Sequence, residues 1–308
     1  MQAGDHTQSR GRTRRVWPAL ARLLEARGCE FRAVAATDSL TPMHLAERAP
    51  EGWVVAAVGG DGTMSQVIAA LPPGRTAGII PTGNTRDFAR SVGYSSSPFI
   101  ALRQLLEGEP RPFDVPAVNG RPFLNVAGVG FDAFLARRAE AVGWRASIGY
   151  FSAFLRRLAT YRSPSLTVQL DGRAGEGRVF QLAVGNCRYY GGGLQVCPKA
   201  HFDDGLLDVC ITEALSPGEA LLALRRLARG THVKHRKVHY TKAHCVRVDG
   251  PAGTVVHADG NPVGTLPATF TVRPRALQLV VPKGTWNPGK VIFIHQRRLP
   301  VGGAETST

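Results

Sequence analysis

Trp53-Val-Val-Ala-Ala-Val58 is an uninterrupted apolar run that leads directly into Gly59-Gly-Asp-Gly-Thr63. The run suits a strand buried on both faces of a sheet, and the pattern over Met64 to Leu71 predicts a helix. Glycines let backbone N–H groups approach phosphate oxygens, and the amino end of a helix carries partial positive charge. The stretch therefore predicts a phosphate-binding turn. The simpler alternative is a tight turn in which Asp61 or Thr63 caps the helix.

Asp61 is the informative residue of this turn. A bare carboxylate beside a polyphosphate would be repelled, so we expect Asp61 to bind a cation, a water held by a cation, or a substrate hydroxyl. A second strand–turn–helix pattern, Gly78-Ile-Ile-Pro-Thr-Gly-Asn-Thr-Arg-Asp-Phe-Ala-Arg90, follows. Two such turns on neighbouring parallel strands are expected to face one crevice. Taken alone, the second segment reads as an ordinary helix, with Asp87 in its first turn.

The strand and helix patterns also divide the chain. They alternate in the first part, which indicates a parallel sheet in an α/β fold. After Pro110 come short alternating strands punctuated by Gly, Asp and Pro, as in an antiparallel sandwich. Helices are expected to interrupt that series over 131–141, 148–161 and 217–229. The predicted organisation is an α/β nucleotide-binding domain over residues 1–112, a β-sandwich-like domain over 113–282 and a carboxy-terminal tail over 283–308 that frays at its end, after Pro300.

Composition narrows the class of protein. With 308 residues, 44% of them hydrophobic, the chain can build two real cores, which excludes a disordered chain, a fibre or a small disulfide-stapled module. The net charge of +15 attracts anionic partners, although the Arg-rich composition also fits codon bias. Five scattered cysteines predict reduced thiols in a cytosolic protein. No apolar run approaches the ~18 residues of a membrane span, and no signal-peptide pattern opens the sequence.

Further motifs follow the two glycine turns along the chain. They are Asn125-Val-Ala-Gly-Val-Gly-Phe-Asp-Ala133, Gly191-Gly-Gly193, Asp203-Asp-Gly-Leu-Leu-Asp-Val209 and Asp259-Gly260. Over residues 8–281, this ordered set resembles the diacylglycerol kinase-like lipid kinases, in the bacterial soluble branch related to sphingosine and ceramide kinases. The resemblance implies an α/β nucleotide domain, a β-sandwich, a cleft between them, and transfer of the γ-phosphoryl group of ATP to a lipid hydroxyl.

The resemblance also implies site residues, position by position. Those expected to hold ATP are Thr37, Gly59, Gly60, Asp61, Gly62, Thr63, Met64, Ser65, Asn84 and Asp87. Asp61 would serve the metal and phosphate end. An accessory Mg²⁺ site is implied at the Asp204 carboxylate and the Leu206 carbonyl, with His201 in a position usually held by an oxygen ligand. A histidine does not suit magnesium, and a simple charged turn at Asp203 and Asp204 is the alternative.

The residue expected to act as general base differs from the family pattern. The acidic residue that usually follows Asp-Gly is Asn261 here, and an amide cannot accept the proton of a lipid hydroxyl at neutral pH. Loss of a general base typically costs ~10²–10⁴ in rate, although phosphoryl transfer depends chiefly on positioning and charge neutralisation. Asp259 is predicted as a substitute base, because residues i and i+2 share a strand face if Gly260 keeps the pleat.

Two further departures concern the nucleotide domain. Arg86 stands where the family has a small amide, and its cation could meet phosphate or simply be solvated. The family's first strand and its Asn-Pro turn are absent, since the matching sequence begins at Ser9. We therefore expect a sheet that lacks one strand, either by true loss or because the natural start lies upstream.

A basic cluster follows an apolar helix face near residue 225. It comprises Arg225, Arg226, Arg229, Lys234, His235, Arg236 and Lys237. Near an anionic leaflet each basic residue contributes ~1 kcal/mol, so the cluster could hold the protein at a membrane surface; a solvated helix exit is the favoured alternative. The expected partners are a lipid alcohol and an anionic membrane surface, for a cytoplasmic, peripherally bound protein. A homodimer is left open, and nucleic acid is not expected.

Two alternatives to a lipid kinase remain. A small-molecule kinase resembling NAD kinase shares Gly-Gly-Asp-Gly-Thr and the two-domain plan. A non-catalytic nucleotide- or lipid-binding relative is supported by Asn261 and the missing strand. The Asp87-Phe-Ala-Arg90 and Asp203–Val209 segments favour the lipid kinase over the NAD kinase-like reading.

Overall fold

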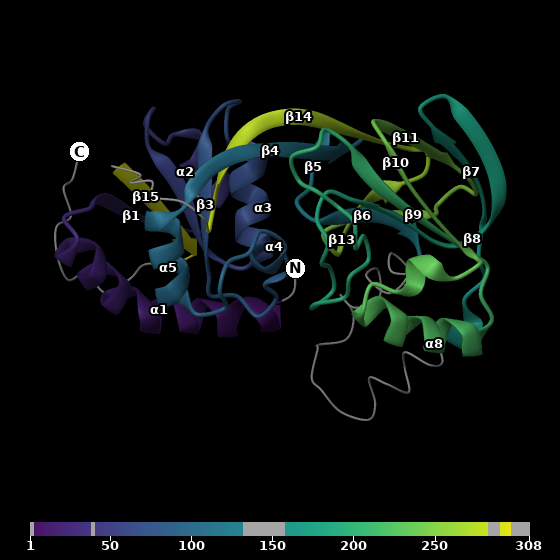
Figure 1. Cartoon of the computed structure of the whole chain (residues 1–308), viewed down its shortest axis with the longest axis horizontal. Coiled ribbons are helices and arrows are strands. Elements are labelled where there is room, and N and C mark those ends of the chain that lie inside the picture. Colours follow the sequence, from purple (N-terminus) through teal and green to yellow (C-terminus); the bar gives the residue numbers. More distant parts are fainter. Residues whose placement is uncertain (1–2, 38–40, 132–157, 283–289, 297–308) are drawn as a thin grey trace. The chain divides into compact units, whose positions relative to one another are not determined.

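The chain forms two compact units, which a computed structural model describes over residues 3–37, 41–131, 158–282 and 290–296 (Figure 1). The parallel-sheet unit comprises Asp5–Phe113 and the described residues from Arg275 on. The sandwich unit comprises Asp114–Pro274. Strands β4 (Glu109–Val118) and β14 (Ala268–Val281) contribute residues to both units. The chain therefore passes from the parallel-sheet unit to the sandwich unit after Phe113 and returns after Pro274, a return that the sequence did not predict.

The parallel-sheet unit is built on parallel strands in the order β1-β15-β2-β3-β14. Besides the end of β14, these are β1 (Glu30–Ala36), β15 (Lys290–Gln296), β2 (Val54–Gly59) and β3 (Thr76–Pro81). All residues of β2 are buried, as expected for a strand covered on both faces. Val55 of β2 is in register with Ile292 on one side and Ala77 on the other.

Strand β15 lies within the segment predicted as a carboxy-terminal tail, where no strand was expected. Its residues Val291–Ile294 are at most 6% exposed, and the Phe293 ring packs edge-on against Trp17 and Phe31, with centroids 5.4 and 6.1 Å away. This apolar run within a basic segment behaves as a buried strand, because both its faces are covered. It pairs with β1 on one side and with β2 on the other, whereas Pro300, after which fraying was predicted, lies outside the described residues.

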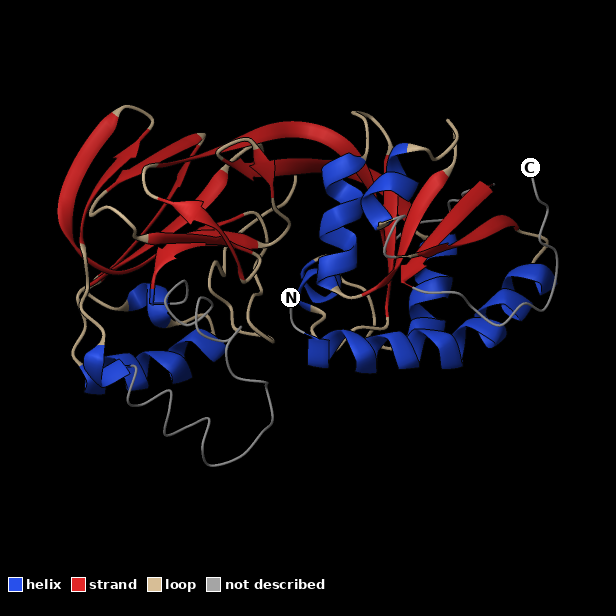
Figure 2. Ribbon diagram, turned by 180° about the vertical axis from the view of Figure 1, so that it is seen from behind, coloured by secondary structure: helices blue, strands red, loops and turns tan. Residues whose placement is uncertain are grey.

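Helices surround the strands of this unit (Figure 2). They are α1 (Ala3–Ala26), α2 (Pro42–Glu47), α3 (Asp61–Ala70), α4 (Asp87–Ser91) and α5 (Pro98–Glu107). Helix α1 buries Leu20 and Leu24 completely. Helix α5 lies so close to β3 that a Cβ on Gly78 would overlap the Leu105 side chain.

The sandwich unit contains two antiparallel sheets that share β8. Its strands are β5 (Arg121–Pro122), β6 (Val126–Gly130), β7 (Ser165–Leu170), β8 (Arg173–Gly185), β9 (Leu207–Glu213), β10 (Val238–Ala243), β11 (Cys245–Asp249), β12 (Val255–Ala258) and β13 (Asn261–Thr265). The first half of β8 joins the order β14-β11-β7-β8, and its second half joins β10-β9-β8-β6-β12-β13. Leu182 and Val246, one from each sheet, lie in a common core.

The predicted fold class, an α/β domain with a mainly parallel sheet followed by a β-sandwich-like domain, is confirmed. The helix expected over 217–229 is α8 (Pro217–Ala228), followed by the short helix η1 (His232–Lys234). The helices expected over 131–141 and 148–161 lie almost wholly outside the described residues. Among the helices that are described, none is both long and apolar enough to span a bilayer.

Candidate functional site

The two glycine turns of the parallel-sheet unit lie against each other. β2 and β3 are parallel neighbours, so their carboxyl ends meet at one edge of the sheet. The amides of Thr82 and Gly83 donate to the Gly59 carbonyl at 2.9 and 3.1 Å. A Cβ on Gly83 would overlap the backbone of Gly60, and a Cβ on Gly59 would overlap the Thr63 side chain. Gly83 is therefore required by the close approach of two backbones, and Gly59 by the Thr63 side chain.

Asp61 joins the two turns. Its Oδ2 accepts a hydrogen bond from the Asp87 amide at 3.0 Å, and its Oδ1 accepts one from the Phe88 amide at 3.3 Å. The carboxylate thus sits at the amino end of α4 while belonging to the first turn of α3, two places where negative charge is favoured. A carboxylate has about four lone-pair positions. The amides of Asp87 and Phe88 each use one of these positions.

The other residues predicted to bind the nucleotide differ in their exposure to solvent. Gly62 and Asn84 are exposed on the turns, Ser65 is half-buried, and nothing lies within 4 Å of a Cβ placed on Gly62. Thr63, Met64 and Asp87 are buried. The Thr63 and Met64 amides both bond to the Gly60 carbonyl, at 3.0 and 3.2 Å. Met64, fully buried, therefore packs in the core and has no group to offer a ligand.

Thr37 lies apart from these residues in the sheet. It is exposed and follows β1, which β15 separates from β2. The structure thus places Thr37 at the same sheet edge as the glycine turns, but two strands away. Its predicted contact with a nucleotide needs a ligand that reaches across β15.

The Arg86 side chain forms hydrogen bonds with the backbone near the second turn. Its guanidinium donates to the carbonyls of Gly83 and Ser96 at 3.0 and 3.1 Å, so it braces the second turn. Burial, followed by the nearby positive charge of Arg12, lowers the pKa of Arg86. Within the described ranges, no carboxylate pairs with either guanidinium. The turns are therefore bordered by positive charge that an anion can neutralise.

In the sandwich unit, Asp259 is part of a hairpin turn and not of a strand. Asp259 and Gly260 have φ values of 47° and 79° and connect β12 to β13. The Asp259 carboxylate accepts hydrogen bonds from the amides of Leu124 and Asn125, both at 2.7 Å, and of Val126, at 3.3 Å. Both oxygens thus hold a neighbouring backbone segment. This geometry argues against Asp259 as the substitute base, because the pleat assumed for it is absent.

Asn261 is the first residue of β13 and is exposed. Its Nδ2 donates to the main-chain carbonyl of Asp259 at 3.3 Å. The amide therefore stabilises the hairpin, and it brings no proton acceptor that would take the place of the family's carboxylate.

The residues predicted to bind accessory magnesium do not fit that ion. The Lys242 ammonium forms an ion pair with Asp204 Oδ2. The Asp204 Oδ1 atom accepts a hydrogen bond from the Leu206 amide at 3.1 Å. His201 is exposed, and among the described residues no group of three or more His, Cys, Asp or Glu could hold a metal ion. An ammonium on the only carboxylate of the predicted set disfavours a divalent cation.

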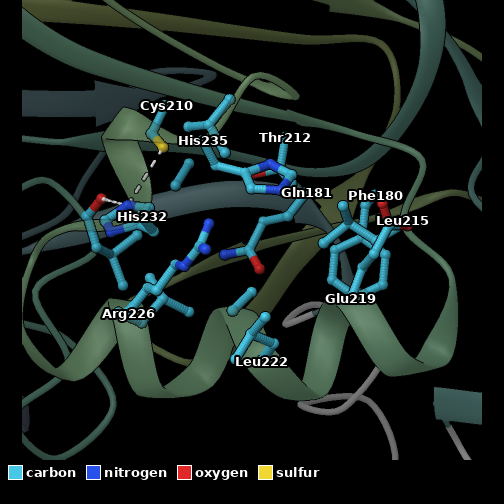
Figure 3. A pocket seen from close by; sticks show the side chains of 15 residues that line it. Phe180, Gln181, Cys210, Thr212, Leu215, Glu219, Leu222, Arg226, His232 and His235 are labelled. Atoms are coloured by element: carbon cyan, nitrogen blue, oxygen red, sulfur yellow. Dashed lines mark hydrogen bonds between the residues drawn. The ribbon is translucent and has the colours of Figure 1, made fainter.

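The sequence analysis missed a cavity in the sandwich unit. About 670 Å³ of space, including the part open to solvent, lies between α8 and the sheet of β8, β9 and β10 (Figure 3). Its apolar lining includes Phe180, Ala183, Val196, Leu215, Leu222 and Leu227. The signal in the sequence was the apolar face of α8 itself, which was read only as a possible approach to a membrane.

Polar groups also line this cavity. Figure 3 shows Arg226 and Gln181 extending toward its middle. The Nε2 atom of His232 lies 3.1 Å from the Val196 carbonyl, and burial lowers the pKa of His232, which favours the neutral ring. An elongated apolar molecule with a small polar portion fits such a lining.

Comparisons with known proteins agree with this architecture. The model of the diacylglycerol kinase catalytic domain matches residues 5–118, and that of the YegS C-terminal NAD kinase beta sandwich-like domain matches residues 125–281. The chain is 34% identical over 278 residues to a diacylglycerol kinase of Mycobacterium tuberculosis, covering 86% of this chain and 89% of that protein. It is 29% identical over 267 residues to a diacylglycerol kinase of Bacillus subtilis, covering 84% and 88%.

The fold is also similar to a solved structure. A crystal structure of a diacylglycerol kinase from Bacillus anthracis superposes with a TM-score of 0.60 over 80% of this chain and 83% of that one, at 21% identity. At this identity the likeness concerns the fold.

Proposed function

The chain belongs to the diacylglycerol kinase-like lipid kinase family, and from this we propose that it transfers the γ-phosphoryl group of ATP to the hydroxyl of diacylglycerol or a related lipid. The contact between the Gly60 and Gly83 turns, locked by Asp61, carries the proposal. Phosphoryl transfer rests mainly on positioning and charge neutralisation. A rigid glycine edge bordered by Arg12 and Arg86 suits both needs.

In this proposal the phosphates lie over the exposed start of α3. Backbone amides at a helix amino end bind anionic oxygens, and Gly62 lets them approach closely. Magnesium in such sites is held largely by the nucleotide phosphates, water and one or two carboxylates. Asp61 is the carboxylate of the turn, so it would contribute a ligand or bind a water of the metal, positioned by the hydrogen bonds from the Asp87 and Phe88 amides.

The cavity beneath α8 supports a lipid as the phosphoryl acceptor. Leu222 lines the cavity and is 52% exposed, and Leu221, next to it, is 41% exposed. Arg225 and Arg229 lie on the same helix and its end, and both are exposed. An apolar edge next to basic residues suits a protein that approaches an anionic membrane surface, where each cation adds about 1 kcal/mol. In the same proposal, an acyl chain enters the cavity past Leu222.

One observation favours a second candidate, a catalytically impaired binding relative. Asn261 offers no base, and the Asp259 carboxylate is engaged by three backbone amides. If the proton of the lipid hydroxyl must be removed by a side chain at this hairpin, turnover would be lower by ~10²–10⁴. Binding of ATP and lipid would remain.

The test incubates the full chain and labelled ATP–Mg with micelles containing diacylglycerol, ceramide or monoacylglycerol, and separately with NAD. We expect label in a lipid, lost by more than tenfold in Asp61→Ala. The matched control is Asp171→Asn, because Asp171 likewise accepts backbone hydrogen bonds, from His244 and Cys245, but in the sandwich unit. Label in NAD alone would refute the lipid proposal, and ATP binding without transfer would establish the second candidate.

A cavity variant tests the lipid part separately. Ala223 lines the cavity, so Ala223→Trp should raise the KM for lipid about tenfold or more and leave ATP affinity unchanged, given that even one methylene of misfit in an apolar pocket costs about tenfold. Ala228→Trp, at an exposed position of the same helix, is the control. Equal lipid KM values in the two variants would place the acyl chain elsewhere.

A further inference from the structure

Lys242 interacts with two acidic side chains, those of Asp204 in the turn before β9 and of Asp208 within β9. Its Nζ forms an ion pair with Asp204 Oδ2 and lies 3.8 Å from Asp208 Oδ2. Asp208 is completely buried, whereas the side chains of Asp204 and Lys242 are 27% and 33% exposed. The single ammonium of Lys242 therefore interacts with two carboxylates at the edge of the sandwich core.

The backbone places Lys242 at this position. β10 and β9 are antiparallel, and Lys242 is directly opposite Asp208 in their register. Residues opposite each other in such a pair have Cβ atoms about 4.5–5.5 Å apart, so the long lysine side chain can extend past Asp208 to Asp204. Tyr240, two residues earlier on the same face of β10, donates its hydroxyl to Asp208 Oδ1 at 2.7 Å.

The position of Lys242 matters because Asp208 is removed from solvent. Asp208 is completely buried, with the Tyr240 hydroxyl on Oδ1 and the Lys242 ammonium near Oδ2. A buried carboxylate is strongly destabilising unless it is paired, so Lys242 supplies the positive charge that this site needs.

We propose that the Lys242 ammonium takes the place of the accessory magnesium ion that the family resemblance implies, so that the Asp204 loop is held without a metal. Magnesium requires near-octahedral oxygen coordination, whereas here one carboxylate oxygen of Asp204 is paired with an ammonium and the other with the Leu206 amide. The lysine supplies from within the chain the positive charge that a bound ion would supply.

Thermal unfolding of the full chain without nucleotide tests the proposal. The melting temperature of the wild type is expected to be the same in excess EDTA and in millimolar MgCl₂. Lys242→Met should lower it by about 5 °C or more in EDTA, because the completely buried Asp208 carboxylate loses the cation beside it. MgCl₂, but not NaCl of equal ionic strength, should restore part of that loss, since the two carboxylates are then free to bind the ion.

Lys199→Met is the matched control. Lys199 lies over the ring of the same Tyr240, at 5.7 Å, and is exposed, but it pairs with neither carboxylate. The Lys199→Met protein should have the melting temperature of the wild type, and MgCl₂ should not change it. If Lys242→Met does not fold, Asp204→Asn provides the test, because it should lower the melting temperature equally in EDTA and in MgCl₂. A wild type destabilised by EDTA, or a Lys242→Met protein that gains nothing from MgCl₂, would overturn the proposal.

Discussion

Truncation of Phe293 to alanine tests whether the carboxy-terminal strand is part of the sheet. Phe293 is fully buried in β15 and packs edge-on against Trp17 and Phe31. Removal of a buried phenylalanine side chain costs about 3–5 kcal/mol. Each aromatic pair adds about 0.5–1.5 kcal/mol beyond the buried area, which puts the expected loss at the upper end of that range.

The measurement is urea denaturation followed by tryptophan fluorescence, with hydrogen exchange of peptides covering β2. We expect Phe293→Ala to lower the free energy of unfolding of the parallel-sheet unit by about 4 kcal/mol and to speed exchange in β2, which hydrogen-bonds to β15. The control, Phe99→Ala, truncates a side chain that is 42% exposed on α5 and should stay within about 1 kcal/mol of the wild type. A Phe293→Ala protein within 1 kcal/mol of the wild type would refute the placement of β15.

Two further predictions concern the turn and α8. Gly83→Ala should lower the free energy of unfolding by about 1–3 kcal/mol, because its Cβ would overlap the Gly60 backbone. The control, Gly62→Ala, has open space around its Cβ and should melt within about a degree or two of the wild type. Equal melting temperatures of the two variants would show that the turns are not in contact. The hydrogen bond from Lys237 lowers the pKa of Glu219 to about 2, from 4.5 when unperturbed. The stability that this pair contributes is therefore fully present above pH 4.5 and is lost as the pH falls toward 2. Glu219→Gln should therefore abolish that part of the acid dependence of the melting temperature, and an unchanged profile would count against the pair.

The order of strand, glycine turn and helix could be predicted from the sequence, because it depends on local patterns. The buried run before Gly59 and the glycines themselves carry the signal. The contact of Gly83 with Gly60, and the hydrogen bond that Asp61 accepts from the Asp87 amide 26 residues later, join segments that are distant in the sequence. No local pattern encodes such contacts, so the structural role of Asp61 was not foreseen.

The errors have equally specific causes. Asp259 was assigned to a continuous strand, but its positive φ makes it a turn residue whose carboxylate binds backbone. β15 was missed because its apolar core, Val291–Ile294, is short and flanked by basic and polar residues. The ammonium of Lys242 reaches Asp204 through the pairing of β10 with β9, a contact that was not visible when the family resemblance implied a metal site there.

The position of β15 also constrains the order of events when the protein is made. β15 is an inner strand of the parallel sheet, so this sheet cannot close until the chain has been made as far as Gln296, when the strands of the sandwich unit have already been synthesised. Domains that emerge first usually fold first, but here the sequence order is inverted. Until β15 has been synthesised, the hydrogen-bonding edges of β1 and β2 that it will cover must not pair with other strands.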